Sequence, residues 1–560
     1  MGSIYEKKPW LDSYPDWFSQ TLELTGATAR DDFICTASSR PDAPAIYYFD
    51  HVMSYGEVNR LSDFLAAAFQ DFGLEIGDRI ILQLQNIPQF LLSVYAAWKV
   101  GLIVVPLNPM YKQHELLYFF KDSGARLFIT HDEIANALDL TFLEQTKVEQ
   151  IFTTSALDFF PSSIPLPECL KAVKRIEVQG CLKFFDILKK YQDKAPEYSD
   201  ITPDTVAYLT YTSGTTGQPK GAMNTHGNIA FNARAYREAM RIGPDDVVLG
   251  VAPLFHVTGE VAHSAIAALA GIPVVLFYRF DPGEALRLIE RWKVTMTVAA
   301  ITVYIAMINH PDIKTRRLES FVKAYSGGAP VSKALVDQFE RLTGLRLHNV
   351  YGMTETNSPS HIVPLGLEAP VDQETGALSV GLPVPNCVSK IMDLEEGTRE
   401  LPPGEVGEIV NRGPMVVPGY WNKPEETAHA IRNGWLFTGD VGKMDEQGWF
   451  YLVDRKKDLI IASGYKVWPR DVEDVLYQHP SVREAAVVGI PDSYRGETVK
   501  AFVALKEGSE GTVTADEIIS FCKSRMAAYK YPRQVEFIKA IPKTLTGKFL
   551  RKDLREKKET

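Results

Sequence analysis

The sequence predicts an α/β fold, in which a large N-terminal region of α/β subdomains with a β-rich subdomain precedes a small α+β C-terminal domain. Three observations support this. The chain has 560 residues, which is too long for one hydrophobic core. Short apolar, β-branched runs alternate with helical patterns over most of its length, which is typical of parallel sheets covered by helices. After about residue 380 the pattern changes to short, turn-rich segments.

The alternation can be followed along the first 300 residues or so. The expected strands are Arg79–Leu84, Leu102–Pro106, Arg126–Thr130, Val247–Val251, Ile272–Tyr278 and Thr295–Ala299. The expected helices among them are Pro88–Val100 and His114–Lys121. A further helix should begin at Asp281 as N-cap, with Pro282 as first helical residue and Glu284 completing a capping box.

The longest apolar stretch, Phe90 to Leu107, has the length of a membrane span. Lys99, Gly101 and Pro106 interrupt it, so a buried helix that runs into a buried strand explains it better. The N-terminus lacks the apolar core of a signal peptide, and we therefore expect a cytoplasmic location.

The charged segment DRKKD, residues 454–458, marks the domain boundary, and the predicted domains are residues 1–455 and 456–560. Gly, Pro and polar turns are dense through residues 402–449, which indicates small antiparallel β elements. The elements expected in the tail are a helix (Arg470–His479), two strands (Ala485–Ile490 and Val499–Leu505), a helix (Ala515–Met526) and a strand (Gln534–Phe537).

Composition excludes some classes of function. The net charge of −10 argues against a nucleic-acid binder, because such proteins usually present a basic face. The five cysteines form no C-x-x-C pair, and their odd number suits reduced thiols rather than a disulfide framework.

The segment TSGTTGQPKG, residues 212–221, follows a predicted strand at Val206–Thr210. Its glycines let backbone N–H groups approach a triphosphate, and its hydroxyls and lysine add further donors. The spacing is not that of a Walker A loop. A surface turn is the alternative for a Ser/Gly/Thr cluster, but the full string is more specific. The predicted ATP-binding residues here are Thr212, Ser213, Gly214, Thr215, Thr216, Gly217 and Lys220.

The string YTSGTTGQPKG resembles the signature of the adenylate-forming superfamily, which includes acyl- and aryl-CoA synthetases, adenylation domains of peptide synthetases and firefly luciferase. The resemblance extends over essentially the whole chain, with further motifs in the expected order. It implies a large N-terminal region and a mobile C-terminal domain of about 100 residues, a common domain size. It also implies that ATP, Mg²⁺ and a carboxylic acid bind.

The segment Tyr351-Gly-Met-Thr-Glu355 combines an aromatic ring, a hydroxyl and a carboxylate, which suit adenine, phosphate and Mg²⁺. By itself it is also compatible with a strand end and a helix cap. Its resemblance to the family's Y-G-x-T-E motif implies that Tyr351 flanks adenine, Thr354 contacts phosphate in catalysis and Glu355 binds the metal. The nucleotide pocket should also include Gly328, Ala329, Asn349, Val350 and Gly352.

The segment Leu436-Phe-Thr-Gly-Asp440 ends in a carboxylate whose two oxygens suit the hydroxyls of ribose. The alternative is that Asp440 merely caps its own turn. The segment Gly448-Trp-Phe that follows completes a match with the superfamily, which favours ribose binding. The family pattern also implies that Arg455 reaches the ribose or the phosphates.

Lys548, in PKTLTGK, resembles the catalytic lysine of the superfamily. A fixed cation between a carboxylate and the α-phosphate stabilises the charge that develops there. A solvated lysine in a basic tail is the alternative, which the T-x-T-G-K context disfavours. His256, in PLFH, either packs in the interior or, as the resemblance to related CoA ligases implies, borders the acyl entrance and the CoA thiol, and we include it among the catalytic candidates.

The superfamily rotates its C-terminal domain between two half-reactions, and the resemblance puts the pivot at Lys457. Lys548 enters the site in the first orientation, and the face around residues 460–465 replaces it in the second. The implied CoA-binding residues are Ser463, Gly464 and Lys466. Many relatives carry Asn or Gln at the position of Lys466, which leaves its role open.

The segments NGWLFTGDVGKMDEQGWFYLVDRKK, VVPLNPMYKQHELLYFFKDSGA and KKPWLDSYP are close to those of fatty-acyl-CoA synthetases. We therefore predict an ATP-dependent fatty acid–CoA ligase, which forms acyl-AMP and pyrophosphate and then acyl-CoA and AMP. The alternatives are an aryl-CoA ligase of the 4-coumarate or benzoate type and an acyl-AMP ligase that loads a carrier protein. The expected partners are a carboxylic acid, ATP and CoA, but no nucleic acid. Peripheral membrane contact and a homodimer are left open.

Overall fold

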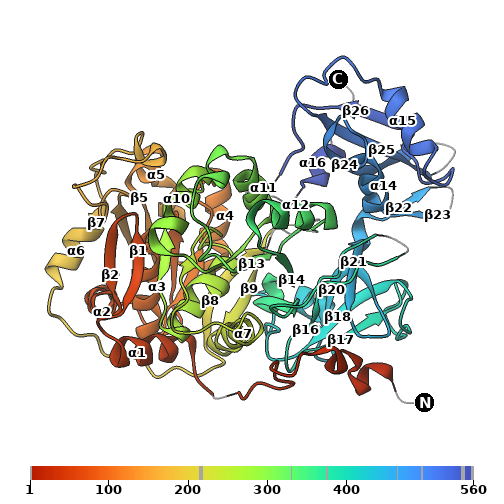
Figure 1. Ribbon diagram of the computed structural model, residues 1–560. Helices are drawn as coiled ribbons and strands as arrows, with labels where there is room; N and C mark the ends of the chain where they lie inside the picture. The colour runs from red at the N-terminus through yellow and green to blue at the C-terminus, as the bar shows by residue number, and fades with distance from the viewer. Residues whose placement is uncertain are drawn as a thin grey trace.

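The computed structural model describes residues 3–24, 26–212, 218–329, 331–373, 376–462, 465–492, 496–543 and 549–555. Within these residues the strands form four β-sheets. Figure 1 shows three of the sheets with their helices in a large N-terminal part, and the fourth in a smaller C-terminal part drawn in blue. The predicted α/β fold class, with a large N-terminal and a small C-terminal domain, is confirmed.

The first sheet carries the strand that leads into the candidate phosphate loop. Its strands run parallel except for the last one, which forms an antiparallel hairpin with its neighbour. In sheet order the strands are β7 (Leu182–Lys183), β6 (Gln150–Thr154), β5 (Leu127–His131), β3 (Arg79–Gln83), β4 (Ile103–Pro106), β8 (Val206–Thr212) and β9 (Lys220–Thr225).

The second sheet is parallel in its centre and has antiparallel strands at both edges. In sheet order the strands are β16 (Leu382–Pro383), β15 (Ser358–Ile362), β14 (Leu347–Met353), β13 (Lys323–Ser326), β12 (Met296–Ala299), β10 (Val248–Leu249), β11 (Val274–Leu276), β1 (Pro44–Tyr48) and β2 (His51–Ser54).

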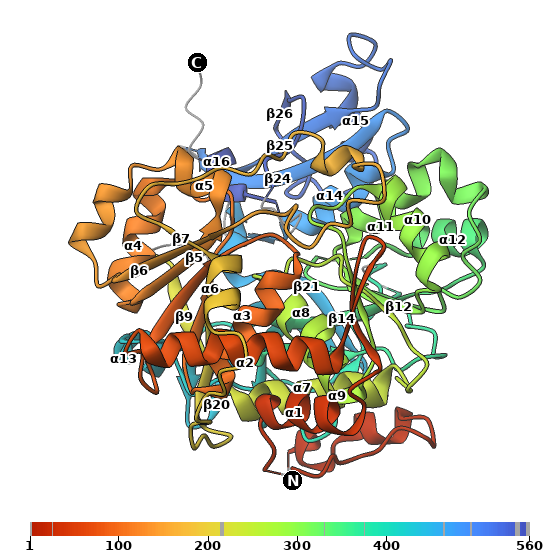
Figure 2. The same ribbon diagram turned by 90° about the vertical axis from the view of Figure 1, so that its left-hand side faces the viewer.

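One hydrophobic core joins these two sheets to the helices that pack against them. Figure 2 shows α2 crossing the face of the molecule, with α1 and α7 beneath it. The N-terminal helices are α1 (Ala29–Ser39), α2 (Tyr55–Asp71), α3 (Pro88–Lys99), α4 (Gln113–Ser123), α5 (Asp132–Ala137), α6 (Phe184–Lys190), α7 (His226–Ala239), α8 (Val257–Gly259), α9 (Ile266–Ala270), α10 (Pro282–Trp292), α11 (Ile301–Asn309), α12 (Lys333–Thr343) and α13 (Pro424–Ala430).

The apolar stretch from Phe90 to Leu107 is a buried helix followed by a buried strand, as predicted. Every residue of α3 and of β4 is buried. The ammonium group of Lys99 lies 2.8 Å from Asp63, and burial lowers the pKa of Lys99 to about 8. Over the described parts of the chain, we find no helix that combines the length and the apolar character needed to span a bilayer.

The start of α10 corrects one local prediction. Asp281 does cap the helix, because its carboxylate accepts a hydrogen bond from the backbone N–H of Glu284 at 2.8 Å. The predicted return contact of a capping box is replaced: the carboxylate of Glu284 instead accepts two hydrogen bonds from Arg287, at 2.7 and 2.9 Å. A guanidinium one turn further along the helix therefore competes successfully with the backbone N–H for this carboxylate.

The third sheet is the predicted β-rich subdomain, and the N-terminal segment packs beneath it (Figure 1). The hydroxyl of Tyr5 donates to the carbonyl of Leu401 at 2.7 Å, and Trp10 packs on Phe450. Gly448 has φ +83°, and a Cβ there would lie 2.4 Å from the backbone of Trp10, so this contact requires glycine. The strands are β17 (Val388–Met392), β18 (Gly407–Arg412), β20 (Trp435–Met444), β19 (Ile431–Arg432) and β21 (Phe450–Arg455).

The C-terminal part has hydrophobic clusters of its own, whose members among the described residues all lie between 460 and 554. All of its predicted helices and strands are present, although the short hairpin β22–β23 was not predicted. The exact boundary between residues 455 and 456 stays a prediction. The elements are β22 (Ile460–Ala462), β23 (Tyr465–Val467), α14 (Pro469–Tyr477), β24 (Val482–Asp492), β25 (Gly496–Leu505), α15 (Ala515–Lys523), β26 (Gln534–Phe537) and α16 (Arg551–Arg555).

Candidate active site

The hairpin of β8 and β9 positions the candidate phosphate loop at the carboxyl end of a parallel strand, where ligands of such sheets bind. Thr212 pairs with Lys220 in the hairpin register. The hydroxyl of Tyr118 donates to the carbonyl of Pro219 at 2.6 Å, and the backbone N–H of Trp421 donates to the carbonyl of Gly221 at 2.8 Å. The predicted loop residues Ser213, Gly214, Thr215, Thr216 and Gly217 lie outside the described residues.

Lys220 and Glu355 both contact Tyr420, a residue that the sequence motifs did not predict. The ammonium of Lys220 lies 4.7 Å from the centre of the Tyr420 ring. The Tyr420 hydroxyl donates a hydrogen bond of 2.8 Å to Oε1 of Glu355, whose residue is only 6% exposed. Burial and the neighbouring carboxylate raise the pKa of Tyr420, so this hydroxyl stays protonated. A cation, a hydroxyl and a carboxylate therefore meet beside the end of β9.

The turn that carries Thr354 and Glu355 is held by buried amide side chains. Asn224 donates to the carbonyl of Thr354 at 3.0 Å and to the side chain of Asn357 at 2.8 Å. Asn232 donates to the carbonyls of Thr356 and Asn357 at 2.7 and 2.6 Å. These bonds satisfy a buried, irregular backbone and restrict its movement.

Gly352 is required by packing at this turn. A Cβ at this position would lie 1.6 Å from the carbonyl oxygen of Ser358 on the neighbouring strand β15. This close approach of the two strands is enough to require glycine at position 352, whether or not a ligand binds there. The contact of Gly352 with the nucleotide stays a prediction.

Tyr351 and Asp440 lie on different sheets and meet at the site. The Tyr351 hydroxyl donates to Oδ2 of Asp440 at 2.8 Å. In place of the predicted turn, Asp440 lies in an irregular part of β20, where Gly439 has φ +71° and the N–H groups of Gly439 and Asp440 donate to the side chains of Glu408 and Thr438. Asp440 therefore does not merely cap a turn. Arg455 pairs with Asp440 in the register of β20 and β21, which places its backbone beside the same carboxylate.

The predicted adenine pocket follows the ends of β13 and β14. Ser326 and Asn349 are register partners on these parallel strands, and Gly328, with φ +80°, and Ala329 follow β13. The amide of Asn349 is committed to the protein, since it donates to the carbonyl of Ser379 at 2.8 Å. Val350 is buried at the next position, and the contact of these residues with the nucleotide stays a prediction.

His256 precedes α8 and is partly exposed. Its Nδ1 accepts a hydrogen bond from the backbone N–H of Thr258 at 3.3 Å, so it caps the first turn.

Four residues later Glu260 begins a π-helix, Glu260–Ala265, and is 1% exposed. The hydroxyl of Thr210 contacts both carboxyl oxygens of Glu260 at 3.0 Å, two residues before the phosphate loop. Burial raises the pKa of Glu260 to about 8. No motif in the sequence predicts this buried carboxyl group.

Glu260 should make stability depend on pH. Its folded pKa of about 8 lies above the ordinary value of 4.5, so the folded protein keeps a proton that the unfolded chain releases. The free energy of unfolding should therefore fall as pH rises between these two values. Glu260→Gln removes this titration, and we expect its gain in Tm over the wild type to be larger at pH 8 than at pH 5 in calorimetry.

The exposed carboxylate Glu510 offers a matched control. Glu510→Gln should shift Tm equally at the two pH values. An equal shift for Glu260→Gln as well would contradict the protonated state of Glu260.

Tyr420 should matter for the affinity of a metal ion bound at Glu355. Residues that hydrogen-bond a metal ligand typically change metal affinity about 10- to 100-fold when mutated. We expect Tyr420→Phe, which removes the donor to Glu355, to raise the Mg²⁺ concentration needed for half-maximal ATP consumption about tenfold. An unchanged Mg²⁺ dependence in Tyr420→Phe would show that the hydroxyl has no part in metal binding and that the Tyr420 ring serves only in packing. Tyr477→Phe, in the C-terminal domain, is the matched control.

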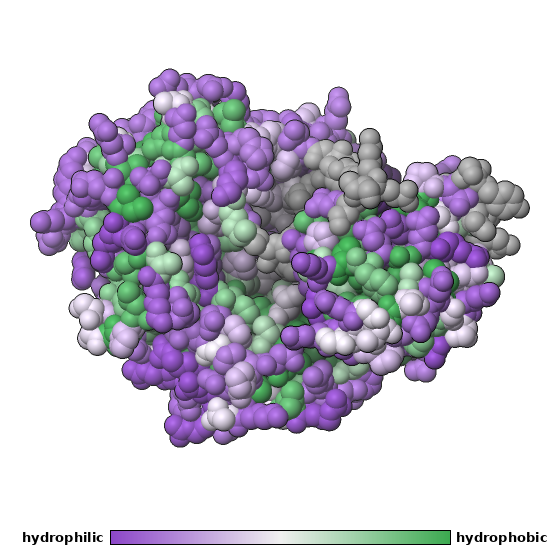
Figure 3. Space-filling view, turned by 90° about the horizontal axis from the view of Figure 1, so that it is seen from above, coloured by the Kyte–Doolittle hydropathy of each residue, from purple (hydrophilic) through white to green (hydrophobic). Residues whose placement is uncertain are grey.

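The remaining predicted residues lie on the C-terminal side. Lys457 is in the short helical turn Lys456–Asp458 that connects β21 to β22. Lys466 pairs with Ile461 in the β22–β23 hairpin. Lys548, Ser463 and Gly464 lie outside the described residues. Seen from above, the surface is hollowed between the large body and the C-terminal domain, and apolar residues border the hollow (Figure 3).

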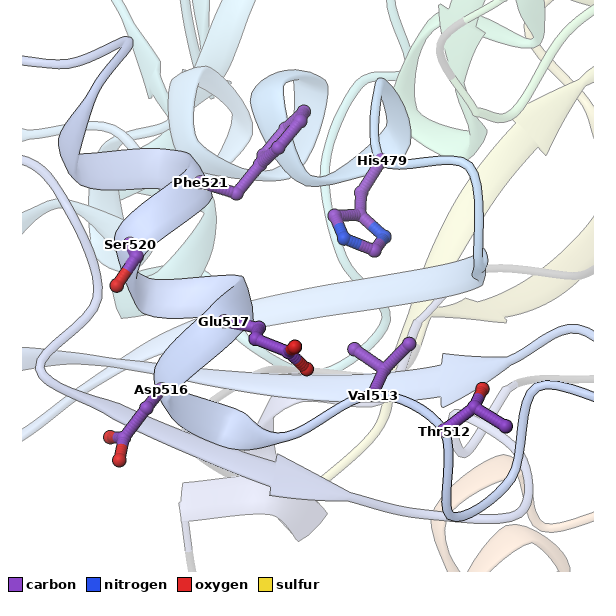
Figure 4. A pocket seen from close by; sticks show the side chains of 7 residues that line it. All are labelled: His479, Thr512, Val513, Asp516, Glu517, Ser520 and Phe521. Atoms are coloured by element: carbon purple, nitrogen blue, oxygen red, sulfur yellow. The ribbon is translucent and has the colours of Figure 1, made fainter.

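A separate groove lies on the C-terminal domain, next to α15. The rings of His479 and Phe521 pack edge to face at one side of it, with centres 4.9 Å apart (Figure 4). Its volume is about 570 Å³. Of the predicted site residues that the structure describes, none belongs to its lining, which consists of His479, Thr512, Val513, Asp516, Glu517, Ser520 and Phe521.

Two protein families match the chain in agreement with this geometry. Residues 35–421 match the family described as AMP-binding enzyme, and residues 471–548 match the AMP-binding enzyme C-terminal domain. The chain belongs to the AMP-binding enzyme family. The first match contains β8, β9 and the turn at Glu355, and the second ends at Lys548. The adenylate-forming membership predicted from the motifs is confirmed, and with it the prediction of an enzyme.

Relatives of this AMP-binding enzyme align over nearly its full length. A long-chain-fatty-acid–CoA ligase of Bacillus subtilis is 39% identical over 99% of this chain and 98% of its own. A long-chain-fatty-acid–CoA ligase of an Escherichia coli O6:H1 strain is 32% identical over 98% of both chains. A feruloyl-CoA synthase of Amycolatopsis is 33% identical over 93% of this chain and 97% of its own.

Solved structures of similar proteins share the whole fold. MatB from Rhodopseudomonas palustris with bound ATP has a TM-score of 0.82 at 27% identity, over 95% of this chain and 99% of its own. The apo form of MatB has a TM-score of 0.72 at 28% identity, over 95% and 99% of the two chains. The o-succinylbenzoate CoA synthetase of Bacillus subtilis, in complex with ATP and magnesium, has a TM-score of 0.78 at 29% identity, over 94% and 99%.

Proposed function

We propose that the protein is an ATP-dependent fatty acid–CoA ligase. It converts a carboxylate and MgATP into acyl-AMP and pyrophosphate, and the thiol of CoA then attacks the adenylate to give acyl-CoA and AMP. The observation that carries this proposal is the full-length similarity to long-chain-fatty-acid–CoA ligases, at 39% and 32% identity. The meeting of Lys220, Tyr420 and Glu355 beside the phosphate loop supports it.

In the first half-reaction, the loop from Thr212 to Gly217 and Lys220 hold the phosphates, and Thr354 contacts the α-phosphate. Tyr351 flanks adenine, while Asp440 and Arg455 hold the ribose side. The hydrogen bond from Tyr351 to Asp440 fixes the carboxylate before ATP arrives, which reduces the cost of ordering it on binding. The wall of this pocket comprises Gly328, Ala329, Asn349, Val350 and Gly352.

Glu355 is the proposed protein ligand of Mg²⁺. A carboxylate oxygen is the donor that Mg²⁺ prefers, and the ion commonly completes its shell with water and substrate phosphates. Among the described residues no group of three or more His, Cys, Asp or Glu side chains could hold a metal ion. When bound, the ion offsets the charge on the phosphates as pyrophosphate leaves.

Lys548 is the proposed catalytic lysine. The carboxylate and the α-phosphate are both anions, so a cation placed between them lowers the barrier to their reaction. His256 is the proposed residue at the acyl and thiol end of the site, and it is partly exposed. The backbone around His256 is fixed by its hydrogen bond to Thr258, which suits a residue that shapes the pocket.

For the second half-reaction, domains 1–455 and 456–560 rotate about Lys457, and CoA binds beside Ser463, Gly464 and Lys466. Rotation removes Lys548 from the site and opens a path for the thiol. The structure agrees better with the ATP-bound form of MatB than with its apo form, at TM-scores of 0.82 and 0.72. This difference supports an assignment of the present arrangement to adenylate formation.

An aryl-CoA ligase is the second candidate, since the feruloyl-CoA synthase of Amycolatopsis is 33% identical. An acyl-AMP ligase that loads a carrier protein is the third. Pyrophosphate release and acyl-CoA formation with acids from acetate to oleate, with 4-coumarate and with benzoate separate all three. Preference for a fatty acid with CoA-dependent turnover supports the proposal, whereas preference for an aromatic acid or adenylate formation without CoA transfer overturns it.

The proposed location is the cytoplasm. Size-exclusion chromatography and sedimentation with lipid vesicles test the homodimer and the peripheral membrane contact that the sequence left open.

A further inference from the structure

A buried arginine lies close to the end of the catalytic-lysine segment. Arg551 is the first residue of α16, three positions after Lys548, and its side chain is 17% exposed. Its guanidinium donates to both carboxyl oxygens of Glu473, at 2.9 and 2.8 Å, and to Asp458 at 3.2 Å. A third carboxylate, that of Asp454, lies 3.7 Å away. Burial by itself would lower the pKa of Arg551, but these carboxylates raise it, so the side chain stays charged.

The three carboxylates come from two sides of the connection between the domains. Asp454 belongs to β21, which pairs with β20 in the third sheet and is part of the N-terminal body. Glu473 is on α14 of the C-terminal domain, where it also accepts a hydrogen bond from the backbone N–H of Val487. Asp458 follows the pivot proposed at Lys457, and it also accepts from Arg555 at 2.7 Å. Within this cluster, Asp454 is the acid on the N-terminal side of the pivot.

Asp454 makes a second contact with the C-terminal domain. Its Oδ2 accepts a hydrogen bond from the backbone N–H of Arg470 at 3.0 Å. The guanidinium of Arg470 also donates to the carbonyl of Leu452, on the same strand as Asp454, at 3.2 Å. The side chain of Asp454 is 3% exposed, so these contacts are protected from solvent screening.

Rotation about residues 456–458 separates these contacts into two groups. Arg470 and Arg551 move with the C-terminal sheet, whereas Asp454 stays with the third sheet. The contacts of Asp454 with Arg470 and Arg551 must therefore break. The contacts of Arg551 with Glu473 and of Arg555 with Asp458 lie within the moving part and can persist.

We propose that Asp454 and Arg551 form a latch between the domains, which stabilises the orientation that forms the adenylate and opens before thioester formation. This inference rests on the proposed function, because it requires the pivot at Lys457. Arg551 is a positioning residue, since it acts on the site through the segment that carries Lys548. The latch consists of the ion pair between Asp454 and Arg551 and requires no other group.

The test compares the two half-reactions in single turnover for Asp454→Asn. Rapid-quench measurement of acyl-AMP from fatty acid and MgATP reports the first step, and transfer from enzyme-bound acyl-AMP to CoA reports the second. We expect the first step to slow about tenfold and the second to be unchanged or faster. Asp471→Asn is the matched control, because Asp471 pairs with Lys530 inside the C-terminal domain, and it should change neither rate. Equal slowing of both steps, or of neither, by Asp454→Asn would overturn the latch.

Proteolysis of the enzyme without substrates provides a readout that does not depend on the acid. Trypsin cleaves after Arg455, Lys456 and Lys457, and these bonds become accessible when the domains separate. Arg551→Gln leaves this segment unchanged, and we expect it to increase cleavage there about tenfold over the wild type. Arg551→Lys keeps the charge with fewer donors and should give an intermediate rate. An unchanged cleavage rate in Arg551→Gln overturns the latch, even if the enzyme uses another acid than the one proposed.

Discussion

Replacement of Lys548 by alanine should slow acyl-AMP formation about 10²- to 10³-fold and leave acyl transfer to CoA nearly unchanged. In the proposed mechanism the lysine acts only while the carboxylate approaches the α-phosphate, where two anions meet and charge develops on the phosphoryl oxygens. The removal of one such electrostatic contact typically has an effect of this size. The measurement is single-turnover formation of acyl-AMP, followed separately by transfer from preformed acyl-AMP to CoA.

Lys543 offers a matched control in the same segment. Its ammonium pairs with Glu484 inside the C-terminal domain. Lys543→Ala should therefore leave both half-reactions within about threefold of the wild type, as expected for a partly exposed ion pair. If Lys548→Ala formed the adenylate at the wild-type rate while folded, the catalytic assignment would be wrong.

Replacement of Lys457 by proline should leave adenylate formation intact and slow thioester formation about a hundredfold. Proline holds φ near −65°, so a pivot at this residue loses the rotation that the second orientation requires. The structure places Lys457 in the turn Lys456–Asp458, between the last strand of the N-terminal body and the first strand of the C-terminal domain. The same two single-turnover assays separate the steps.

Lys457→Ala is the control for this prediction, because alanine removes the side chain but keeps the backbone rotation. It should behave like the wild type in both steps. Equal loss of both half-reactions in Lys457→Pro would place the pivot elsewhere, or show that the substitution disturbs the fold.

The local elements were predictable because their signals lie within a few neighbouring residues. The apolar run at Phe90–Leu107 could be assigned to a helix and a strand from its length and its interruptions, and the C-terminal elements from their periodicity. The capping box at Glu284 was wrong because a competing arginine lies one helical turn away. Pattern rules for capping consider the backbone partner and leave such competitors out.

Hydrogen bonds between distant segments could not be predicted in the same way. Tyr420 reaches Glu355 across 65 residues, and Tyr351 reaches Asp440 across 89. The buried contact of Thr210 with Glu260 likewise joins a strand to a π-helix that has no sequence signature. Such pairs depend on how sheets and helices pack, and neither member carries a local pattern that points to the other.

The sequence by itself determined that this protein is an adenylate-forming enzyme, and it predicted the residues of the site: a phosphate-binding string, an aromatic–hydroxyl–carboxylate motif, a ribose carboxylate and a lysine near the C-terminus. These features are recognisable because each is a short run whose residue types and spacing match one chemical task. The tertiary structure alone decided which distant side chains meet, including Tyr420 beside Glu355, Thr210 beside the buried Glu260, and Asp454 beside Arg551. The physical reason is that burial and long-range contacts arise only when separate elements pack together.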